Sequence, residues 1–296
     1  MIKQSIKKSK LLITGGNGLL GKQLIPLLLE DYEIYSILRK KPDSILKNVE
    51  YLYIDLSTQW NTSILPNDID IIIHLAQSSK FRDIPSEAED IFNVNIKSTA
   101  QLLDFARKNN IQKFVYASSG GIYGTNSNRA FNESSPITAT DQLGFYLGSK
   151  LCGEVLVRNY STLFDVITLR FFFMYGPKQH KTMLIPRLIS KVRNNDSIIL
   201  TGYNGIKINP INVDDAKKAV QNTLSLDGSY VFNIGGSEVY SIREIAEVIG
   251  DTFGKKPIFE IVDEKAKDLI GDITGMKNKL YIPKIDFHKG IKSFIL

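Results

Sequence analysis

Cysteine is nearly absent from this sequence. The chain of 296 residues contains one cysteine, Cys152, which excludes an internal disulfide framework and a metal cluster built from cysteines. Histidine is scarce as well, with only His74, His180 and His288. The sequence therefore predicts no metal site, and Cys152 and His180 are interpreted as structural residues.

Long apolar runs are also missing. No segment reaches the ~18 consecutive apolar residues that a membrane span needs. The start MIKQSIKKSK is basic, but a short strand-like run and then glycines follow it, in place of the apolar core and cleavage site of a signal peptide. We therefore expect a cytoplasmic protein with no membrane partner.

Acidic residues are outnumbered by basic ones, and the formal net charge is +6. The lysines are scattered along the chain, so the excess favours a solvated surface over a binding field for a polyanion. No nucleic-acid partner is expected. The content of 43% hydrophobic and 23% charged residues is typical of a globular chain with one or two domains.

Short aliphatic runs alternate with longer amphipathic ones in the first half of the chain. The expected strands are Lys10–Thr14, Glu33–Leu38, Val49–Ile54, Ile69–Leu75, Lys113–Ser118 and Asp165–Phe172. The expected helices are Leu19–Glu30, Glu87–Asn109 and Gln142–Tyr160. This alternation predicts an α/β fold with a Rossmann-type, doubly wound parallel sheet.

The alternation loosens after Pro177. Helix-like stretches return at Leu184–Arg193 and Ile242–Phe253, with mixed sequence between them. We therefore expect a dinucleotide-binding domain over residues 1–177. A smaller C-terminal substrate lobe is expected over residues 178–296, with some segments returning to the first domain.

The stretch LLITGGNGLLGKQL, from Leu11 to Leu24, holds glycines between an expected strand and an expected helix. Gly15, Gly18 and Gly21 follow one another at intervals of three. Glycine there permits a tight turn and lets a pyrophosphate approach the N–H groups at the start of the helix. The loop predicts a dinucleotide site, and Asn17 and Leu19 are expected among its contacts.

With TGGNGLLG from Thr14 to Gly21, the sequence resembles the extended short-chain dehydrogenase/reductase family, the NAD-dependent epimerase/dehydratase group that modifies nucleotide sugars. The resemblance continues through YLYIDLS, IIIHLAQSS, NVNIKSTAQLLDFA and LRFFFMYGP. It implies that Asp55 and Leu56 contact the adenine and that Leu75 and Ala76 lie along the cofactor. Asn95 stands where the family has a structural asparagine.

The pattern Tyr-x-x-x-Lys occurs twice, at YLGSK (Tyr146 to Lys150) and at YNGIK (Tyr203 to Lys207). The Asn-Gly pair in the second copy is a turn signal, so that copy is interpreted as a chance match. The first copy opens an expected helix, where positions four apart share one face. Tyr146 and Lys150 are therefore the expected catalytic pair.

A tyrosine with an ordinary pKa of about 10 is a poor base at neutral pH. A nearby lysine ammonium and an oxidised nicotinamide both lower the pKa of the phenol, so Tyr146 can exchange a proton with a substrate hydroxyl or carbonyl. The resemblance implies that Lys150 also holds the nicotinamide ribose. It also implies that Ser119 in VYASSGGIYG donates a hydrogen bond to the reacting oxygen, with Ser118 as the alternative.

Two departures from the family pattern concern the reaction and the substrate. Dehydratases of the family carry an acidic pair after the catalytic hydroxyl, but Gly120 and Gly121 follow Ser119 here, which disfavours a 4,6-dehydratase. Phe173 replaces the asparagine of the epimerase pattern LRFFNVYGP that contacts the substrate.

The pattern that usually has an arginine before VDD reads IKINPINVDD, with Ile208 in that place. This departure leaves the diphosphate side of the substrate without its usual arginine. The candidate substrate residues are Phe173, Arg187, Lys191 and Lys207. For each of the three cations, a solvated surface residue is the alternative interpretation.

The cofactor preference depends on YEIYSILRK, where an NAD enzyme usually carries an acid that binds the adenosine ribose. No acid is present at the end of this strand. Arg39 can meet a 2′-phosphate through charge-assisted hydrogen bonds. The sequence therefore predicts NADP in preference to NAD.

The expected function is hydride transfer at a sugar carbon, C4 by preference, of a nucleotide-activated hexose, by a 4-keto-sugar reductase or a 4-epimerase. The alternatives are a catalytically silent NADP-binding regulator and a reductase of another small carbonyl compound. The resemblance also implies a homodimer in which helices Glu87–Asn109 and Gln142–Tyr160 pair with their copies.

Overall fold

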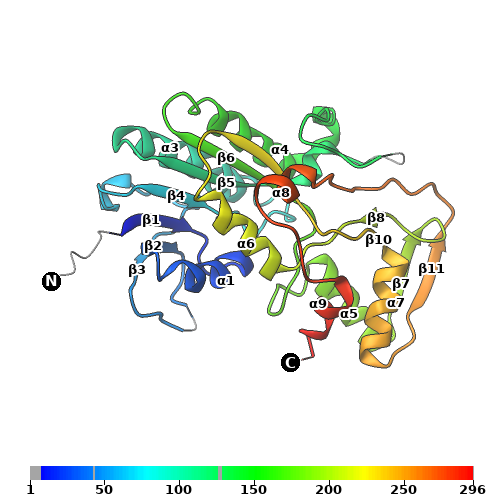
Figure 1. Ribbon diagram of the computed structural model, residues 1–296. Helices are drawn as coiled ribbons and strands as arrows, with labels where there is room; N and C mark the ends of the chain where they lie inside the picture. The colour runs from blue at the N-terminus through cyan, green and yellow to red at the C-terminus, as the bar shows by residue number, and fades with distance from the viewer. Residues whose placement is uncertain (1–7, 43, 126–128, 296) are drawn as a thin grey trace. The chain divides into compact units, whose positions relative to one another are not determined.

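A seven-stranded sheet forms the centre of the chain in the computed structural model, which describes residues 8–42, 44–125 and 129–295 (Figure 1). In spatial order its strands are β3 (Val49–Tyr53), β2 (Tyr32–Leu38), β1 (Ser9–Thr14), β4 (Ile71–His74), β5 (Lys113–Ser119), β6 (Asp165–Phe171) and β9 (Tyr230–Ile234). β1 pairs in parallel with β2 on one side and with β4 on the other. The chain therefore reverses its winding between β1 and β4, and the predicted doubly wound fold is confirmed.

The central strands are buried on both faces, which explains their continuous apolar sequences. Leu11, Leu12 and Ile13 of β1 are completely buried, as are Ile72 and Ile73 of β4. Such runs are typical of parallel strands covered by helices on both sides. The apolar content of these segments is therefore what places them in the middle of the sheet.

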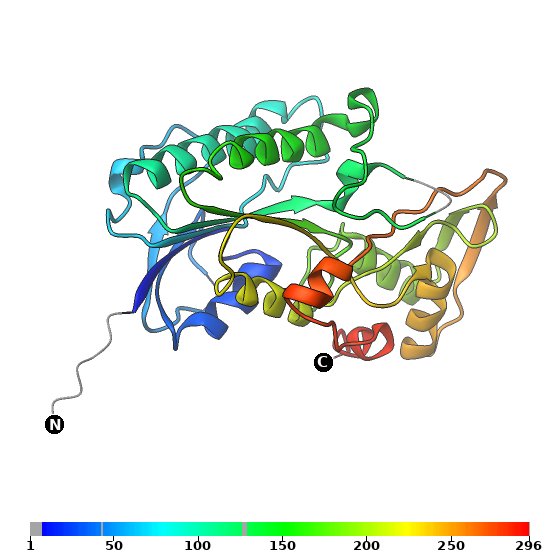
Figure 2. The same cartoon turned by 45° about the horizontal axis from the view of Figure 1, so that its top comes forward.

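Helices cover both faces of the sheet, as Figure 2 shows for α1 on one face and α3 on the other. The helices of this region are α1 (Leu19–Leu28), α2 (Ala88–Phe92), α3 (Ser98–Lys108) and α4 (Thr140–Arg158), with short turns η1 (Thr62–Ile64) and η3 (Gly120–Tyr123). The expected helix Glu87–Asn109 is divided, because the π-helical turn η2 (Asn93–Lys97) separates α2 from α3. α3 buries Leu102, Leu103 and Phe105 in the core of the sheet.

The backbone forms two compact units. The first combines the chain up to Ser118 with Gly144–Leu169 and Thr223–Val231. The second combines Ser119–Leu143, Arg170–Asn222 and the chain from Phe232 onward. The functional domains expected over residues 1–177 and 178–296 stay a prediction.

Two small sheets and several helices make up the second unit. Its elements are α5 (Leu184–Asn194), β7 (Ser197–Thr201), β8 (Lys207–Ile208), α6 (Val213–Thr223, apart from its last residue), β10 (Tyr240–Ser241), α7 (Ile242–Phe253), β11 (Ile258–Val262), α8 (Thr274–Lys279) and α9 (Phe287–Lys292). β7 pairs in parallel with β11, and β8 pairs antiparallel with β10. The helices α5 and α7 agree with the expected ones, whereas the small sheets have no clear periodic signal in the sequence.

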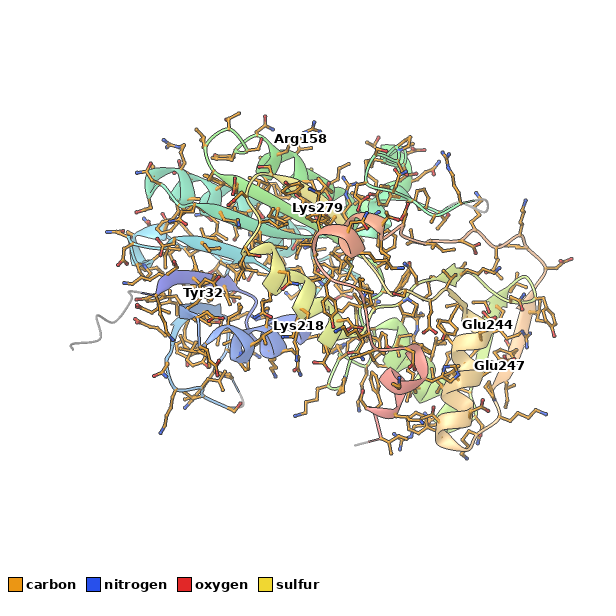
Figure 3. All side chains as sticks on the ribbon, in the orientation of Figure 1. Tyr32, Arg158, Lys218, Glu244, Glu247 and Lys279 are labelled. Carbon is orange, nitrogen blue, oxygen red and sulfur yellow. The ribbon has the colours of Figure 1, made fainter. Side chains whose placement is uncertain are left out.

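The start of α7 shows how local sequence defines an element here. Ser241 accepts a hydrogen bond from the N–H of Glu244, and the Glu244 carboxylate accepts one from the N–H of Ser241 (Figure 3 labels Glu244). This reciprocal cap satisfies two N–H groups that the helix itself leaves free. Gly254, with φ +64°, ends the helix in a left-handed conformation.

Candidate active site at the carboxyl ends of the strands

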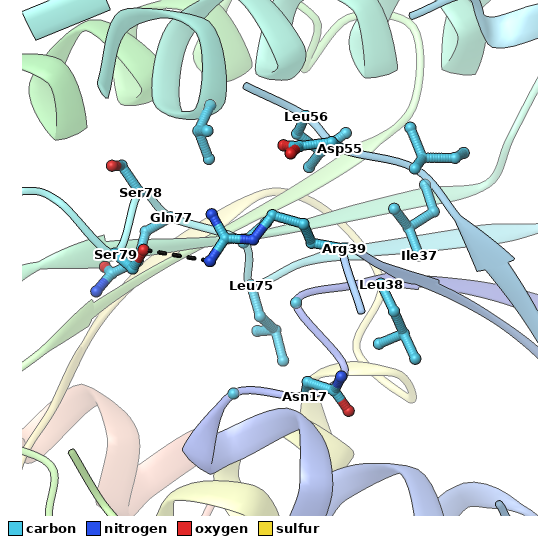
Figure 4. A pocket seen from close by; sticks show the side chains of 15 residues that line it. Asn17, Ile37, Leu38, Arg39, Asp55, Leu56, Leu75, Gln77, Ser78 and Ser79 are labelled. Carbon is cyan, nitrogen blue, oxygen red and sulfur yellow. Dashed lines mark hydrogen bonds between the residues drawn. The ribbon is translucent and has the colours of Figure 1, made fainter. Parts of the chain in front are cut away.

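A cavity of about 330 Å³ opens at the carboxyl ends of β1, β2, β3 and β4 in the first unit (Figure 4). This is the point where the winding of the sheet reverses, the usual ligand site of such folds. The predicted cofactor residues that line the cavity are Gly15, Asn17, Gly18, Arg39, Asp55, Leu56, Leu75 and Ala76. Sequence positions up to 61 residues apart, from Gly15 to Ala76, therefore meet in one cavity.

The glycine loop forms the floor of this cavity by close backbone packing. Gly15 has φ +74°, and a Cβ at that residue would lie 2.8 Å from the backbone nitrogen of Ala76. A Cβ on Gly21 would lie 2.5 Å from the carbonyl oxygen of Gly15. Gly18 begins α1 without a side-chain cap, so N–H groups in the first turn lack a side-chain partner and suit a pyrophosphate.

Leu19 and Gly21 were also predicted to contact the cofactor, but they lie outside the cavity lining. Both lie in the first turn of α1, and neither lines the cavity. Asn17 does line it, and its side-chain amide donates to the carbonyl oxygen of Lys40 at 2.8 Å. This bond connects the glycine loop with the segment after β2.

Arg39 and Asp55 supply opposite charges to a cavity whose walls are otherwise mainly apolar. Arg39 extends toward Ser79, with 3.5 Å between Nη2 and Oγ (Figure 4). Burial raises the pKa of Asp55, but hydrogen bonds from the hydroxyl and N–H of Ser57, together with the cations of Arg39 and Lys80, outweigh it. The pKa of Asp55 therefore lies below its usual value, and the carboxylate is ionised at neutral pH.

These features fit a dinucleotide. The apolar side chains of Ile37, Ile54 and Val94 offer a surface for an adenine ring, and the glycine loop accommodates a pyrophosphate. Arg39 is the cationic side chain among the residues that line the cavity. The residues present are therefore able to hold NAD(P).

Tyr146 lies beside this cavity through its bond to a lining residue. Its hydroxyl donates to Oε1 of Gln77 at 3.0 Å, and its ring packs on Phe81 with 4.8 Å between centroids. Burial raises the pKa of Tyr146 to about 12, and the Arg82 guanidinium opposes this shift. The expected lowering of this pKa is not produced by the protein alone, because burial outweighs the nearby cation.

Lys150 is buried one helical turn after Tyr146 in α4. Only 2% of its surface is exposed, and its Nζ donates to the carbonyl oxygen of Ala117 in β5 at 2.9 Å. Burial lowers the pKa of Lys150 to about 8, while the Glu154 carboxylate acts against that shift. Gly144, with φ +63° and ψ 173°, interrupts α4, so a regular helix begins just before Tyr146.

The two serines after β5 differ in their surroundings. Ser119 belongs to the second unit, where its Oγ accepts a hydrogen bond from the N–H of Gly121 at 3.2 Å. Ser118 belongs to the first unit, and its buried hydroxyl has no hydrogen-bond partner among the described residues. The choice between the two as the catalytic hydroxyl stays a prediction in favour of Ser119.

Asn95 joins two elements near the cavity. Its Oδ1 accepts from the N–H of Ser78 at 2.9 Å, and its Nδ2 donates to Oγ of Ser149 at 2.8 Å. It lies in the π-helical turn, a type of local irregularity that is frequent at functional sites. Its geometry is that of a structural residue that connects the segment after β4 with α4.

The candidate substrate residues all lie in the second unit. Phe173 has φ +45°, which is rare for an aromatic residue and more common for the asparagine that the family pattern has there. Lys191 donates to the carbonyl oxygen of Ser197 at 2.6 Å, so its ammonium already has a structural partner. Arg187 on α5 and Lys207 on β8 are exposed, and among the described residues no hydrogen bond or ion pair joins these side chains to one another.

The second Tyr-x-x-x-Lys copy is a turn, as predicted. Tyr203 is 68% exposed in the connection between β7 and β8, and Gly205 has φ +71°. Tyr203 and Lys207 do not lie on one helix face. The turn that the Asn-Gly pair predicted is therefore confirmed, and the interpretation of YNGIK as a chance match stays a prediction.

Gln77 is the site residue that the sequence did not indicate. It directly follows Ala76 in IIIHLAQSS and lines the cavity, but its partner Tyr146 is 69 residues away in the chain. Its position next to the predicted cofactor residues was the available signal. Phe81 and Arg82 were missed for the same reason, because only tertiary folding brings them to Tyr146.

Sheet order, glycine loop and cavity together define a Rossmann-type fold. The chain belongs to the NAD dependent epimerase/dehydratase family, whose model matches residues 11–235. It is 27% identical to the dTDP-D-glucose 4,6-dehydratase of Homo sapiens over 97% of this chain and 89% of that protein.

Solved structures agree with the fold. A UDP-N-acetylglucosamine 4-epimerase from Methanobrevibacter ruminantium M1, in complex with UDP-N-acetylmuramic acid, has a TM-score of 0.85 with 23% identity over 98% of both chains. A UDP-glucuronic acid 4-epimerase from Bacillus cereus, in complex with UDP-glucuronic acid and NAD, has a TM-score of 0.83 with 24% identity over 96% of this chain and 97% of that one. At these identities the likeness establishes the fold.

Across residues 8–42, 44–125 and 129–295, no three histidine, cysteine, aspartate or glutamate side chains are grouped so that they could hold a metal ion. In the same part of the chain, no helix combines the length and the apolar character of a membrane span.

Proposed function

We propose that the protein transfers hydride at C4 of a nucleotide-activated hexose with NAD(P), as a 4-epimerase or a 4-keto-sugar reductase. The observation that carries the proposal is the bond from the Tyr146 hydroxyl to Gln77, which lines the dinucleotide cavity. Lys150, four residues later, is buried, and burial lowers its pKa to about 8. A tyrosine and a lysine beside such a cavity are the groups that proton transfer at a carbinol carbon needs.

The residues have separate roles in this proposal. A bound nicotinamide would accept hydride in its oxidised form and donate it in its reduced form. Tyr146 takes the proton from the substrate hydroxyl during oxidation and returns it during reduction. Lys150 carries positive charge that stabilises the phenolate and binds the ribose, and Ser119 donates a hydrogen bond to the reacting oxygen.

A dehydratase activity is not proposed, although a dehydratase is among the relatives. An ideal Cβ on Gly120 would lie 2.4 Å from the ring of Phe172, which is 1% exposed. An acidic side chain at that position would have to displace a buried aromatic ring. This packing argues against the acid that dehydratases of the family carry after the catalytic hydroxyl.

Epimerase and reductase are each favoured by one observation. Both solved neighbours described above are named 4-epimerases, and one was solved with NAD. Arg39 lines the cavity, and no acid stands at the end of β2. This combination favours NADP over NAD, and NADP favours a net reductive role. We propose NADP as the preferred cofactor.

A panel of nucleotide sugars and 4-keto sugars, incubated with NAD or NADPH, tests the proposal. The products are analysed by mass and stereochemistry. Net consumption of NADPH identifies a reductase, whereas an isomerised product without net cofactor turnover identifies an epimerase. Tyr146→Phe is the matched inactive control. Cofactor binding without turnover of any member of the panel would favour the silent regulator, and turnover restricted to simple carbonyl compounds would favour the alternative reductase.

We also propose a homodimer formed through α3 and α4. Val155 on α4 is 55% exposed and is therefore accessible to a second copy of the chain. The mass of the protein in solution tests the assembly, and Val155→Glu should yield the monomer. The proposed cytoplasmic location is tested by fractionation of the source cells.

A further inference from the structure

The segment from Gln77 to Arg82 connects the dinucleotide cavity with Tyr146. Gln77, Ser78 and Ser79 line the cavity, whereas Phe81 packs on the ring of Tyr146. The Arg82 guanidinium lies 4.8 Å from the centroid of the Phe81 ring. One short segment therefore contacts both the cofactor site and the proposed acid–base residue.

Several bonds hold this segment in place. The N–H of Ser78 donates to Asn95, and the hydroxyl of Ser78 donates to the carboxylate of Asp90. Lys80 forms ion pairs with Glu87 at 2.7 Å and with Asp90 at 3.7 Å. Because Ser78 is fixed from two sides, the backbone next to it holds the Gln77 side chain within reach of Tyr146.

The hydroxyl of Tyr146 has one proton, and in this structure it is donated to Oε1 of Gln77. A carbonyl oxygen suits the neutral phenol but not the phenolate, which only accepts hydrogen bonds. A primary amide also carries two N–H donors, and its terminal torsion has a broad, two-fold energy profile. A half-turn of the amide would therefore present Nε2–H to the phenolate.

We propose that Gln77 is a positioning residue for Tyr146, whose side-chain amide accepts from the neutral phenol and, after a half-turn, donates to the phenolate. This inference rests on the proposed function for its catalytic meaning. The amide gives each protonation state of Tyr146 a hydrogen bond of the correct polarity. Because a bond to an ionised acceptor is stronger than one between neutral groups, the partner favours the phenolate overall.

The charged and titratable groups around Tyr146 do not replace this partner. Arg82 lies on the same segment as Gln77, and its positive charge acts on Tyr146. The phenol of Tyr116 in β5 also interacts electrostatically with Tyr146. On α4, Lys150 is bonded to Ala117, and Glu154 acts on Lys150. Gln77 is the neutral partner that can reverse its polarity.

Two variants separate hydrogen bonding from shape. Gln77→Glu keeps the shape but presents only acceptors and a negative charge, whereas Gln77→Leu presents neither donor nor acceptor. Gln77→Leu should raise the pH at which Tyr146 ionises by about one unit, since a charge-assisted bond exceeds a neutral one by about a factor of ten in equilibrium terms. Gln77→Glu should raise that pH further.

The experiment is a spectroscopic titration of the phenolate with saturating oxidised cofactor. Subtraction of the same titration in a Tyr146→Phe background isolates Tyr146 in each Gln77 variant. Gln112→Glu is the matched control, because Gln112 is exposed just before β5 and adds the same charge away from the site. The pH dependence of kcat on the active sugar provides a second readout.

Ionisation of Tyr146 at progressively higher pH in Gln77→Leu and Gln77→Glu supports the inference. Ionisation of Tyr146 at the same pH in Gln77→Glu and in the wild-type protein would overturn it, because a purely structural role predicts that the isosteric variant leaves this pH unchanged. The titration needs no sugar substrate. A shifted titration without turnover of any nucleotide sugar would therefore reject the proposed function and retain the role of Gln77.

Discussion

The Nδ1 atom of His74 lies 2.6 Å from Oγ1 of Thr14, and this contact belongs to a continuous chain of hydrogen bonds. Thr14 accepts from the N–H of Ala76, and its hydroxyl keeps a proton that can be donated to Nδ1. At the other side of the ring, Thr99 donates to the carbonyl oxygen of Asn95 and therefore accepts from Nε2–H. His74 is thus a neutral imidazole with its proton on Nε2.

His74→Asn should remove the contribution of His74 to the pH dependence of the free energy of unfolding. Burial lowers the pKa of His74 to about 3, and the Lys150 ammonium adds to this shift. Below about pH 6.5 the unfolded chain takes up a proton that the folded chain does not. The free energy of unfolding therefore decreases as the pH is lowered from about 6.5 to 3. From pH 7 to pH 5 the wild-type protein should lose about 2 kcal/mol relative to the variant.

Urea unfolding of both proteins at the two pH values measures this difference. His180→Asn is the matched control, because it makes the same replacement at an exposed histidine. A constant difference between wild type and His74→Asn across this range would contradict the buried neutral imidazole.

Tyr146→Phe should lower turnover by roughly 10² to 10⁴, the range expected for loss of a general acid–base. The variant keeps the aromatic ring that packs on Phe81, so its fold and its cofactor affinity should be almost unchanged. Tyr203→Phe is the control, because the exposed Tyr203 heads the chance copy of the motif. Steady-state kinetics on the active sugar is the measurement, and full activity of Tyr146→Phe would remove the tyrosine from the mechanism.

Some residues of this site could be predicted from the sequence, and others could not. The glycine loop is a local pattern, so Gly15, Gly18 and Gly21 were found with their strand and helix. Asp55 and Leu75 were implied by the family resemblance of the segments YLYIDLS and IIIHLAQSS, and the structure places both on the cavity wall. Local motifs therefore indicated eight of the residues that line the cavity, but not its whole wall.

Other features depend on contacts that no local pattern encodes. Gln77 approaches Tyr146 only after the sheet and α4 have formed. The π-helical turn around Asn95 has the same apolar periodicity as an ordinary helix, so the division of the expected helix was missed. The raised pKa of Tyr146 also results from burial, which the sequence does not specify.

Lys150→Met should weaken cofactor binding and turnover while changing how stability depends on pH. The pKa of Lys150 is lowered to about 8 by burial, so between about pH 8 and 10.5 the unfolded chain binds the extra proton. Stability of the wild-type protein should therefore rise with pH in that window, by about 2.5 kcal/mol from pH 7 to pH 10 relative to the variant. Thermal unfolding at both pH values measures this, and parallel changes in the two proteins would contradict it.

Arg39→Ala should weaken NADP binding by roughly 10- to 100-fold, because a charge-assisted pair with the 2′-phosphate is lost. NAD lacks this phosphate, so its dissociation constant should change far less. Lys41→Ala is the control, since Lys41 is exposed and does not line the cavity. Isothermal titration with both cofactors is the measurement, and tighter binding of NAD by the wild-type protein would defeat the NADP preference.

Lys113→Met should destabilise the fold without affecting the cofactor site. The Nζ atom of Lys113 donates to the carbonyl oxygens of Thr223, Leu224 and Leu226, where α6 ends. The side chain is 5% exposed, so the methionine would leave buried carbonyl groups without their donor, at a cost of about 2 to 4 kcal/mol.

The position of Lys113 separates this effect from catalysis. Lys113 begins β5, at the end of the strand away from the cavity, so NAD(P) affinity should stay unchanged in the variant while its urea midpoint falls. Lys108→Met is the matched control, because Lys108 is exposed and pairs only with the exposed Asp104 among the ion pairs of the described residues. Equal midpoints for the two variants would show that the buried ammonium does not stabilise the end of α6.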